Sequence, residues 1–261
     1  MCFINGKIAS IIFMMCGDLE MHNLKDKKCP ILDVKELNAQ SYYDNFSSLK
    51  EYEFKYEKIV ATDGAIIGYE ILLNFDKAKA YGDHVSQYQK SIYDTSATEA
   101  AISMLLSNRS IYGARRYFIN FERMHLCNKI LLRKIALLSK KLHANNIELV
   151  LEITERNVCG FCSQIDDGLE FLNDMNVSLA VDDFDIYSEE DDFRMPEVLS
   201  GIYQYIKIEV PLNEVQRRQF HHFSSRADIS VRKIIVERIE HRNMIAGLAK
   251  SFGFQGYAYK T

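Results

Sequence analysis

The stretch Glu148-Leu149-Val150-Leu151-Glu152-Ile153-Thr154-Glu155 decides the fold. Its apolar run is short and contains residues that favour β-strands, and carboxylates follow it. This pattern is expected for a buried strand that ends at a polar edge. The same arrangement recurs along the chain. We predict strands at Phe54–Val60, Ala65–Leu72, Tyr117–Phe121, Glu148–Ile153, Ser178–Val181, Tyr205–Ile208 and Lys233–Val236.

Segments with helical spacing of apolar residues separate most of these strands. We predict helices at Ser96–Ser107, Lys129–His143, Ile165–Met175, Met195–Gly201, Leu212–Ser224 and Arg242–Phe252. The alternation indicates β/α units around a parallel sheet. The turn Thr62-Asp63-Gly64 is an exception, because it joins the first two strands as an antiparallel hairpin.

The length of 261 residues fits a single α/β barrel. Residues 1–48 have weak periodicity and are predicted to form an N-terminal extension, weakly structured or helical, before a barrel domain at residues 49–261. No Pro-rich or Ser/Gly-rich linker divides the second part. The apolar run from Ile8 to Met15 is too short to span a bilayer, so we expect no membrane association.

Charge and cysteine usage narrow the class of function. The formal net charge is −4 and no basic run is long enough to follow a nucleic-acid backbone, so nucleic-acid polymers are not predicted as partners. The six cysteines are scattered over a long chain rather than arranged as a disulfide framework. Reduced thiols and a cytoplasmic location fit this pattern best.

Acids repeatedly follow the predicted strands. These residues are Glu70, Glu152, Glu155, Asp182, Asp183, Glu209 and Glu237. In a parallel barrel the C-terminal strand ends meet at one face, where such carboxylates would repel one another unless divalent cations neutralised them. Two Mg²⁺ or Mn²⁺ ions would suit attack of water on a phosphodiester. The alternative is that Glu155, Asp182 and Asp183 are helix N-caps.

The acids also fall in recognisable motifs. Gly68-Tyr69-Glu70-Ile71-Leu72-Leu73 looks like a Glu-Ala-Leu signature with Ile71 in place of alanine. The other segments, in order, are Tyr117-Phe118-Ile119-Asn120, Leu151-Glu152-Ile153-Thr154-Glu155, Leu179-Ala180-Val181-Asp182-Asp183-Phe184, Tyr205-Ile206-Lys207-Ile208-Glu209, Val236-Glu237-Arg238-Ile239-Glu240 and Gln255-Gly256-Tyr257. Together they resemble the EAL family of cyclic di-GMP phosphodiesterases between Tyr52 and Lys260.

The resemblance implies a TIM-type barrel with an antiparallel first strand and hydrolysis of cyclic di-GMP to pGpG with two Mg²⁺ or Mn²⁺ ions. A homodimer is expected only by resemblance. The site residues that it implies are Glu70, Asn120, Glu152, Asp182 and Asp183 for the metals, Lys207, Glu237 and Glu155 for catalysis, and Leu72, Asn74 and Gln255 for the substrate. Lys207 also has a structural alternative, an ion pair with Glu152 or Asp182.

Several positions depart from the family pattern. Asn74 stands where an arginine usually grips a substrate phosphate, and the loop from Asp185 to Asp192 is acidic and glycine-free where the family has a Gly-rich loop. Other departures are Glu57-Lys58 for Gln-Pro, Glu209 for aspartate, Arg238 for glycine and a shortening between Gly253 and Gln255 that predicts a stunted last strand.

These departures leave other functions open. The second hypothesis is a catalytically weak or inactive EAL-like regulator that acts by binding a partner protein. A third, an unrelated metal hydrolase on a similar barrel, remains because fold does not fix substrate.

Overall fold

The computed structural model describes residues 54–74, 95–107, 114–155, 162–190, 192–226, 228–229, 231–248 and 250–259. The extension predicted at residues 1–48 lies outside the described residues.

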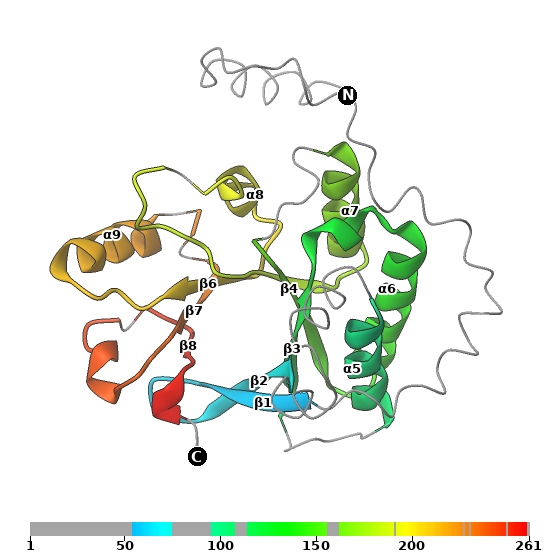
Figure 1. The fold of residues 1–261 in the computed structure, drawn as a ribbon, viewed down its shortest axis with the longest axis horizontal. Coiled ribbons are helices and arrows are strands. Elements are labelled where there is room, and N and C mark those ends of the chain that lie inside the picture. Colours follow the sequence, from blue (N-terminus) through cyan, green and yellow to red (C-terminus); the bar gives the residue numbers. More distant parts are fainter. Residues whose placement is uncertain are drawn as a thin grey trace, which may run out of the picture. The chain divides into compact units, whose positions relative to one another are not determined.

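The strands close into a barrel in chain order, from β1 to β8 (Figure 1). They are β1 (Phe54–Val60), β2 (Ile66–Leu73), β3 (Arg116–Phe121), β4 (Glu148–Ile153), β5 (Ser178–Val181), β6 (Tyr205–Glu209), β7 (Lys233–Glu237) and β8 (Gly253–Phe254). Strand β1 is antiparallel to both β2 and β8, and the remaining neighbours are parallel. This confirms the predicted TIM-type barrel with an antiparallel first strand.

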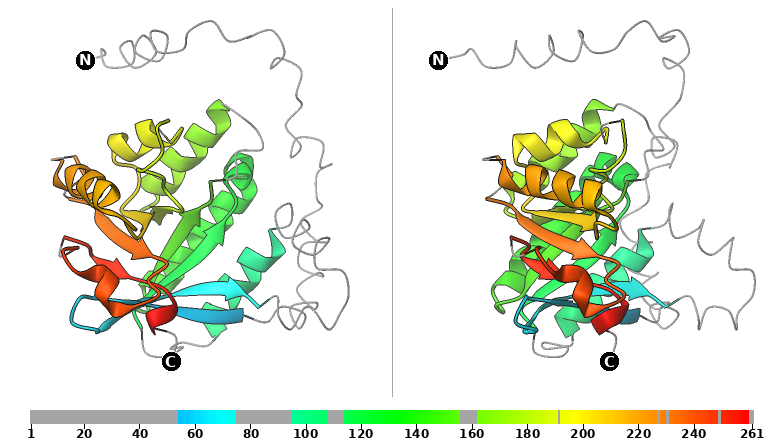
Figure 2. Two further views of the ribbon diagram at one scale, coloured as in Figure 1. Left: turned by 60° about the vertical axis from the view of Figure 1, so that its left-hand side comes forward. Right: turned by 90° about the vertical axis from the view of Figure 1, so that its left-hand side faces the viewer.

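Helices lie outside the strands, with α5 beside β3, α6 beside β4 and α7 beside β5 (Figures 1 and 2). They are α5 (Ser96–Ser107), α6 (Lys129–His143), α7 (Ser163–Asp174), α8 (Met195–Ser200) and α9 (Glu214–Ser225), with 3₁₀ turns η3 (Arg123–Cys127), η4 (Arg242–Ile245) and η5 (Tyr257–Tyr259). Side-chain caps begin two of them: Asn128 accepts from Leu131 N and Asn213 from Gln216 N. None of the described helices is long and apolar enough to cross a bilayer.

The helix predicted at Arg242–Phe252 is wrong. Among the described residues of this range only the short turn η4 forms, because Gly247 adopts a left-handed backbone with φ +81° and breaks the helical path. The chain then pairs as β8, with Phe252 N donating to Ile234 O and Gln255 N to Val236 O. Closing the barrel overrides the helical spacing, and β8 is as short as the sequence indicated. The other predicted helices and strands form within two residues of their expected ends.

Alternation along the strands builds the barrel interior in layers. The middle layer is an apolar cluster formed by Ile59, Phe118, Val150, Ala180, Tyr205 and Ile235. Two residues further along their strands, on the same inward face, stand Asn120, Glu152, Asp182, Lys207 and Glu237. The apolar layer therefore forms the floor of a polar chamber at the C-terminal ends of the strands.

The helix α7 packs closely against η3 at Gly168, so a substitution there tests this packing. A Cβ added there would lie 2.3 Å from the backbone oxygen of Leu126 in η3. Although alanine favours helix by about 1 kcal/mol, we expect Gly168→Ala to lower the free energy of unfolding by about 1–3 kcal/mol, because the backbone of η3 must shift. The measurement is urea unfolding followed by circular dichroism.

The matched control is Glu170→Ala, an exposed position of the same helix, which should change the free energy of unfolding by no more than about 0.5 kcal/mol. Equal stability of Gly168→Ala and the wild type would show that α7 does not pack as closely as described.

Candidate functional site

The ammonium group of Lys207 lies at the centre of the polar chamber. Its Nζ is 2.7 Å from Glu152 Oε1, 2.9 Å from Glu237 Oε1, 3.0 Å from Asp182 Oδ1 and 3.3 Å from Glu70 Oε2. Burial disfavours the charged ammonium, but the surrounding carboxylates outweigh burial and raise the pKa of Lys207 well above its usual value. The ion pairs predicted between Lys207 and Glu152 or Asp182 are present.

Two amide side chains complete the chamber. Asn120 Nδ2 donates to Glu70 Oε1 at 3.3 Å, and Gln255 Nε2 donates to Glu70 Oε2. Gln255, predicted to contact substrate, thus sits among the buried carboxylates. Strands β2, β3, β4, β5, β6 and β7, together with the residue after β8, all contribute to one constellation.

Negative charge exceeds positive charge in this chamber. Burial is the main reason that the pKa of Glu152 rises well above its usual value, and the charge of Glu70 adds to it. Burial likewise raises the pKa of Glu237 to about 8, with Asp182 and Glu70 opposing its ionisation and Lys207 favouring it. Such shifts indicate that an added positive charge would stabilise the ionised form of these carboxylates.

Three buried oxygen atoms in the chamber have no aligned hydrogen-bond donor among the described residues. Neither carboxylate oxygen of Glu152 has an aligned hydrogen-bond donor, although Oε1 lies close to Lys207 Nζ, and Gln255 Oε1 has none either. Unpaired buried oxygens are costly unless a donor or cation faces them. Oxygen ligands of this kind suit hard divalent cations.

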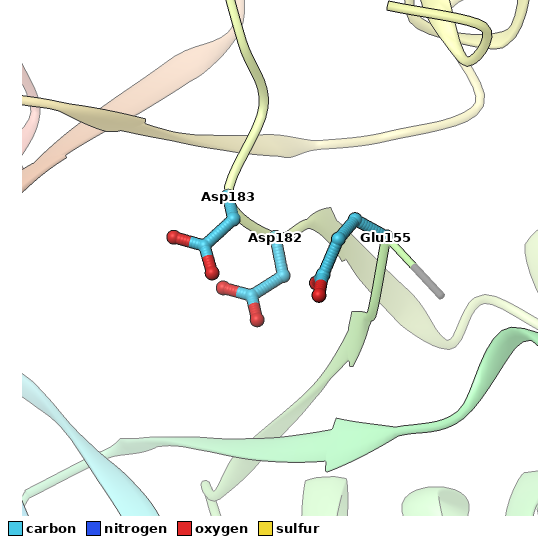
Figure 3. Close-up of side chains that lie close together, drawn as sticks. All are labelled: Glu155, Asp182 and Asp183. Atoms are coloured by element: carbon cyan, nitrogen blue, oxygen red, sulfur yellow. The ribbon is translucent and has the colours of Figure 1, made fainter. Parts of the chain in front are cut away.

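A second acidic group forms at the rim of the chamber. One carboxylate oxygen each from Glu155, Asp182 and Asp183 lies within 4.8 Å of the others (Figure 3). Partial burial, followed by the charges of Asp182 and Glu155, raises the pKa of Asp183. Asp182 belongs to both groups, so the two clusters share one carboxylate.

The alternative that these rim acids cap helices is not supported. Helices α6, α7, α8 and α9 begin at the N-cap residues Asn128, Cys162, Arg194 and Asn213. The acids instead stand past the ends of β4 and β5 and face one another (Figure 3).

A cleft of about 310 Å³ opens beside the rim, at the ends of β1 to β5. Leu72, Asn120 and the three rim acids line it, as does Lys55 from β1. Asn74 follows β2 directly and is half-buried, but it is not among the lining residues. The volume is within the range of small-molecule sites.

Two departures from the family pattern pair with each other. Arg238 stands where a glycine was expected and keeps the left-handed backbone, with φ +57°. Its Nη1 lies 2.7 Å from Glu209 Oε1 and its Nη2 lies 3.9 Å from Asp183 Oδ1. A cation therefore reaches the rim from β7, at the cost of a backbone conformation that residues with a Cβ rarely adopt.

Sequence reasoning missed Lys55 and Arg194. Lys55 lies opposite Leu72 in the β1–β2 ladder, and only the hairpin register brings it to the cleft. Arg194 is 1 % exposed and bonds to the backbone of the paired aspartates. Its proximity to Asp192 in the sequence was the only signal, and such pairs are usually found on the surface.

Comparisons with known proteins bear on the fold. No family model matches the sequence, and no curated protein matches it. Among solved structures, the chain is similar to an EAL-domain protein of Listeria monocytogenes EGD-e (17% identity, TM-score 0.58, 87% of this chain and 94% of that one). It is also similar to Klebsiella pneumoniae BlrP1 in a calcium and cyclic di-GMP complex (16% identity, TM-score 0.58, 79% of this chain and 54% of that one). A third similar structure is Vibrio cholerae LapD bound to cyclic di-GMP (18% identity, TM-score 0.59, 83% of this chain and 55% of that one).

These likenesses define the class of fold. The chain has the EAL-type barrel fold, at a sequence identity of 16–18% to these structures. It spans only about half the length of the BlrP1 and LapD chains. The similarity to these structures is one of fold, whereas activity and ligands depend on the residues of the site.

The raised pKa of Glu237 predicts how stability varies with pH. An unfolded glutamate ionises near its ordinary pKa of 4.5, whereas the folded protein holds the proton up to about pH 8. The folded state thus binds more protons between these values, so the free energy of unfolding of chelator-treated protein should fall as pH rises from 6 to 8. We expect a loss on the order of 1 kcal/mol per pH unit, measured by urea unfolding.

Glu237→Gln should show a smaller loss, and the exposed control Glu240→Gln should behave as the wild type. Stability that rises from pH 6 to pH 8 would contradict the buried, protonated state of Glu237.

Proposed function

We propose that the protein is a phosphodiesterase that hydrolyses cyclic di-GMP to pGpG with two divalent cations, Mg²⁺ or Mn²⁺. The observation that carries this proposal is the convergence of Glu70, Glu152, Asp182 and Glu237 on Lys207 at the C-terminal end of the barrel. Active sites of such barrels lie at this face. The EAL-type fold and the cyclic di-GMP complexes among its structural neighbours support the choice of substrate.

The donor set fits two cations. One ion would be held by Glu70, Asn120, Glu152 and Asp182. Glu152 Oε2, which has no hydrogen-bond donor among the described residues, is a suitable ligand for it. The second would be held by Asp183 with Asp182, and Glu155 lies within reach of the same position. When bound, the ions would polarise the phosphoryl oxygens and lower the pKa of attacking water.

The chain's own residues would supply the remaining chemistry. Lys207 keeps four carboxylates in place, and its positive charge would stabilise negative charge that develops on the phosphoryl group. Glu237, whose pKa of about 8 lies near neutrality, is suited to accept and release a proton. Glu155 stands at the rim, where it can orient water or the second ion.

The cleft beside the rim would receive the substrate. Leu72 offers an apolar surface for a base, and Lys55 offers a positive charge for a phosphate in the same cleft. Asn74 supplies no charge, so we expect weak binding at the position where the family uses arginine. Gln255 would act from the chamber through Glu70.

Removing one chamber carboxylate should abolish turnover. We expect Glu70→Gln and Glu152→Gln to lower the rate of pGpG formation by about 100-fold or more, because each loses a metal ligand while keeping its shape. The assay is chromatographic detection of pGpG from cyclic di-GMP and Mn²⁺. Glu240→Gln, an exposed acid past β7, is the matched control and should keep full activity. Unchanged rates in both chamber variants would rule out the assigned site.

A second candidate function is a catalytically weak or inactive regulator that binds a partner protein. The position of Arg238 favours it, because a guanidinium 3.9 Å from Asp183 can compete with a cation at the rim. Purified wild-type protein that yields no pGpG with Mn²⁺, yet binds a partner through the barrel, would support this alternative. A homodimer and a cytoplasmic location remain predictions.

An arginine at position 74 tests whether this position contributes to substrate binding. We expect Asn74→Arg to lower KM by about 10-fold with little change in kcat, because a bidentate contact to phosphate strengthens binding of substrate and transition state alike. Asn74→Gln is the control, since it lengthens the side chain without charge. An unchanged KM in Asn74→Arg would show that this position does not reach the substrate.

A further inference from the structure

The guanidinium of Arg194 is buried directly behind the paired aspartates. Its Nη1 donates to Asp182 O at 2.6 Å and its Nη2 to Asp183 O at 3.0 Å. Phe184 and Phe193 flank it, with the guanidinium carbon 5.7 Å and 5.6 Å from the ring centres. A fully buried cation thus contacts the backbone on both sides of Asp183.

Asp183 requires such support. It has φ +44°, a left-handed conformation that is strained for a residue with a side chain. Phe184 N donates to Lys207 O at 2.9 Å, and Asp182 N donates to Ile153 O at 3.1 Å. Neighbouring strands therefore bind the backbone N–H groups of Asp182 and Phe184, while Arg194 binds the carbonyl oxygens of Asp182 and Asp183.

Asp192 fixes the guanidinium in turn. Its Oδ1 accepts from Arg194 Nε at 2.9 Å and its Oδ2 from Nη2 at 2.7 Å, and Oδ1 also accepts from Arg194 N. The same carboxylate accepts from Asp185 N at 3.3 Å, which ties in the start of the acidic loop. A bidentate pair of this kind is both strong and directional.

A neighbouring arginine has a different role. Arg123 is also buried, pairs in bidentate fashion with Glu197 and lies 5.2 Å from the ring centre of Phe193. None of its described hydrogen bonds reaches Asp182 or Asp183. Arg123 therefore provides a matched comparison for a purely structural buried ion pair.

We propose that Arg194, oriented by Asp192, is a positioning residue that fixes the backbone of Asp182 and Asp183 and thereby sets their carboxylates for a divalent cation. Glycine would adopt the backbone of Asp183 without strain but would supply no carboxylate, so the hydrogen bonds from Arg194 hold this conformation instead. The inference rests on the proposed function in so far as the cation is that of the phosphodiesterase site.

The test compares Arg194→Lys and Asp192→Asn with the control Arg123→Lys. Mn²⁺ binding is measured by electron paramagnetic resonance, and hydrogen exchange is followed at the amide of Phe184. We expect the first two variants to bind Mn²⁺ about 10-fold more weakly and to exchange faster at Phe184, as for other residues that orient metal ligands. Arg123→Lys should lower the melting temperature without weakening Mn²⁺ binding.

Mn²⁺ affinity equal to the wild type in both Arg194→Lys and Asp192→Asn would overturn the proposal, while leaving the proposed function intact. If the wild type binds no Mn²⁺, the proposed function fails, and exchange at Phe184 decides the positioning role alone. Exchange no faster in Arg194→Lys than in Arg123→Lys would then overturn it. Asp192→Asn, which keeps the size of the side chain, carries the test if Arg194→Lys does not fold.

Discussion

The contact of one buried ammonium with four carboxylates is the interaction on which the site depends. Lys207 is 1 % exposed, and each carboxylate that faces it comes from a different strand. Burying several charges is costly unless they are paired in good geometry, and the closed barrel supplies that geometry by bringing the strand ends together. Four carboxylates face a single lysine, so the divalent cations of the proposed function would balance the remaining negative charge.

The departures from the family pattern are not independent of one another. Arg238 replaces an expected glycine, and it pairs with Glu209, which replaces an expected aspartate. In the acidic loop, Asp185 accepts hydrogen bonds from Tyr187 N and Ser188 N, and Asp192 pairs with Arg194. Side-chain hydrogen bonds thus give the loop a defined shape where the usual loop relies on glycine.

These substitutions explain why two functions fit one fold. The chamber gathers four carboxylates around one lysine, as the proposed phosphodiesterase requires, whereas Arg238 lies at the rim and Asn74 carries no charge. The chamber therefore supports the proposed phosphodiesterase, and the rim supports the proposed regulator. Both features lie on the same barrel, so the fold alone does not choose between them.

Local patterns in the sequence determined most of the fold. Apolar runs such as Leu149 to Leu151 fixed the strands, the Asp63-Gly64 turn indicated the antiparallel start, and the acids after the strands indicated one shared site. The tertiary structure alone decided the rest. Segments far apart in sequence close the barrel, so the turn η4 and the approach to β8 replace the predicted helix before Gly253. Lys55 reaches the cleft through the hairpin register, and Arg194 is buried behind Asp183. Such long-range contacts leave no periodic signal in a single sequence.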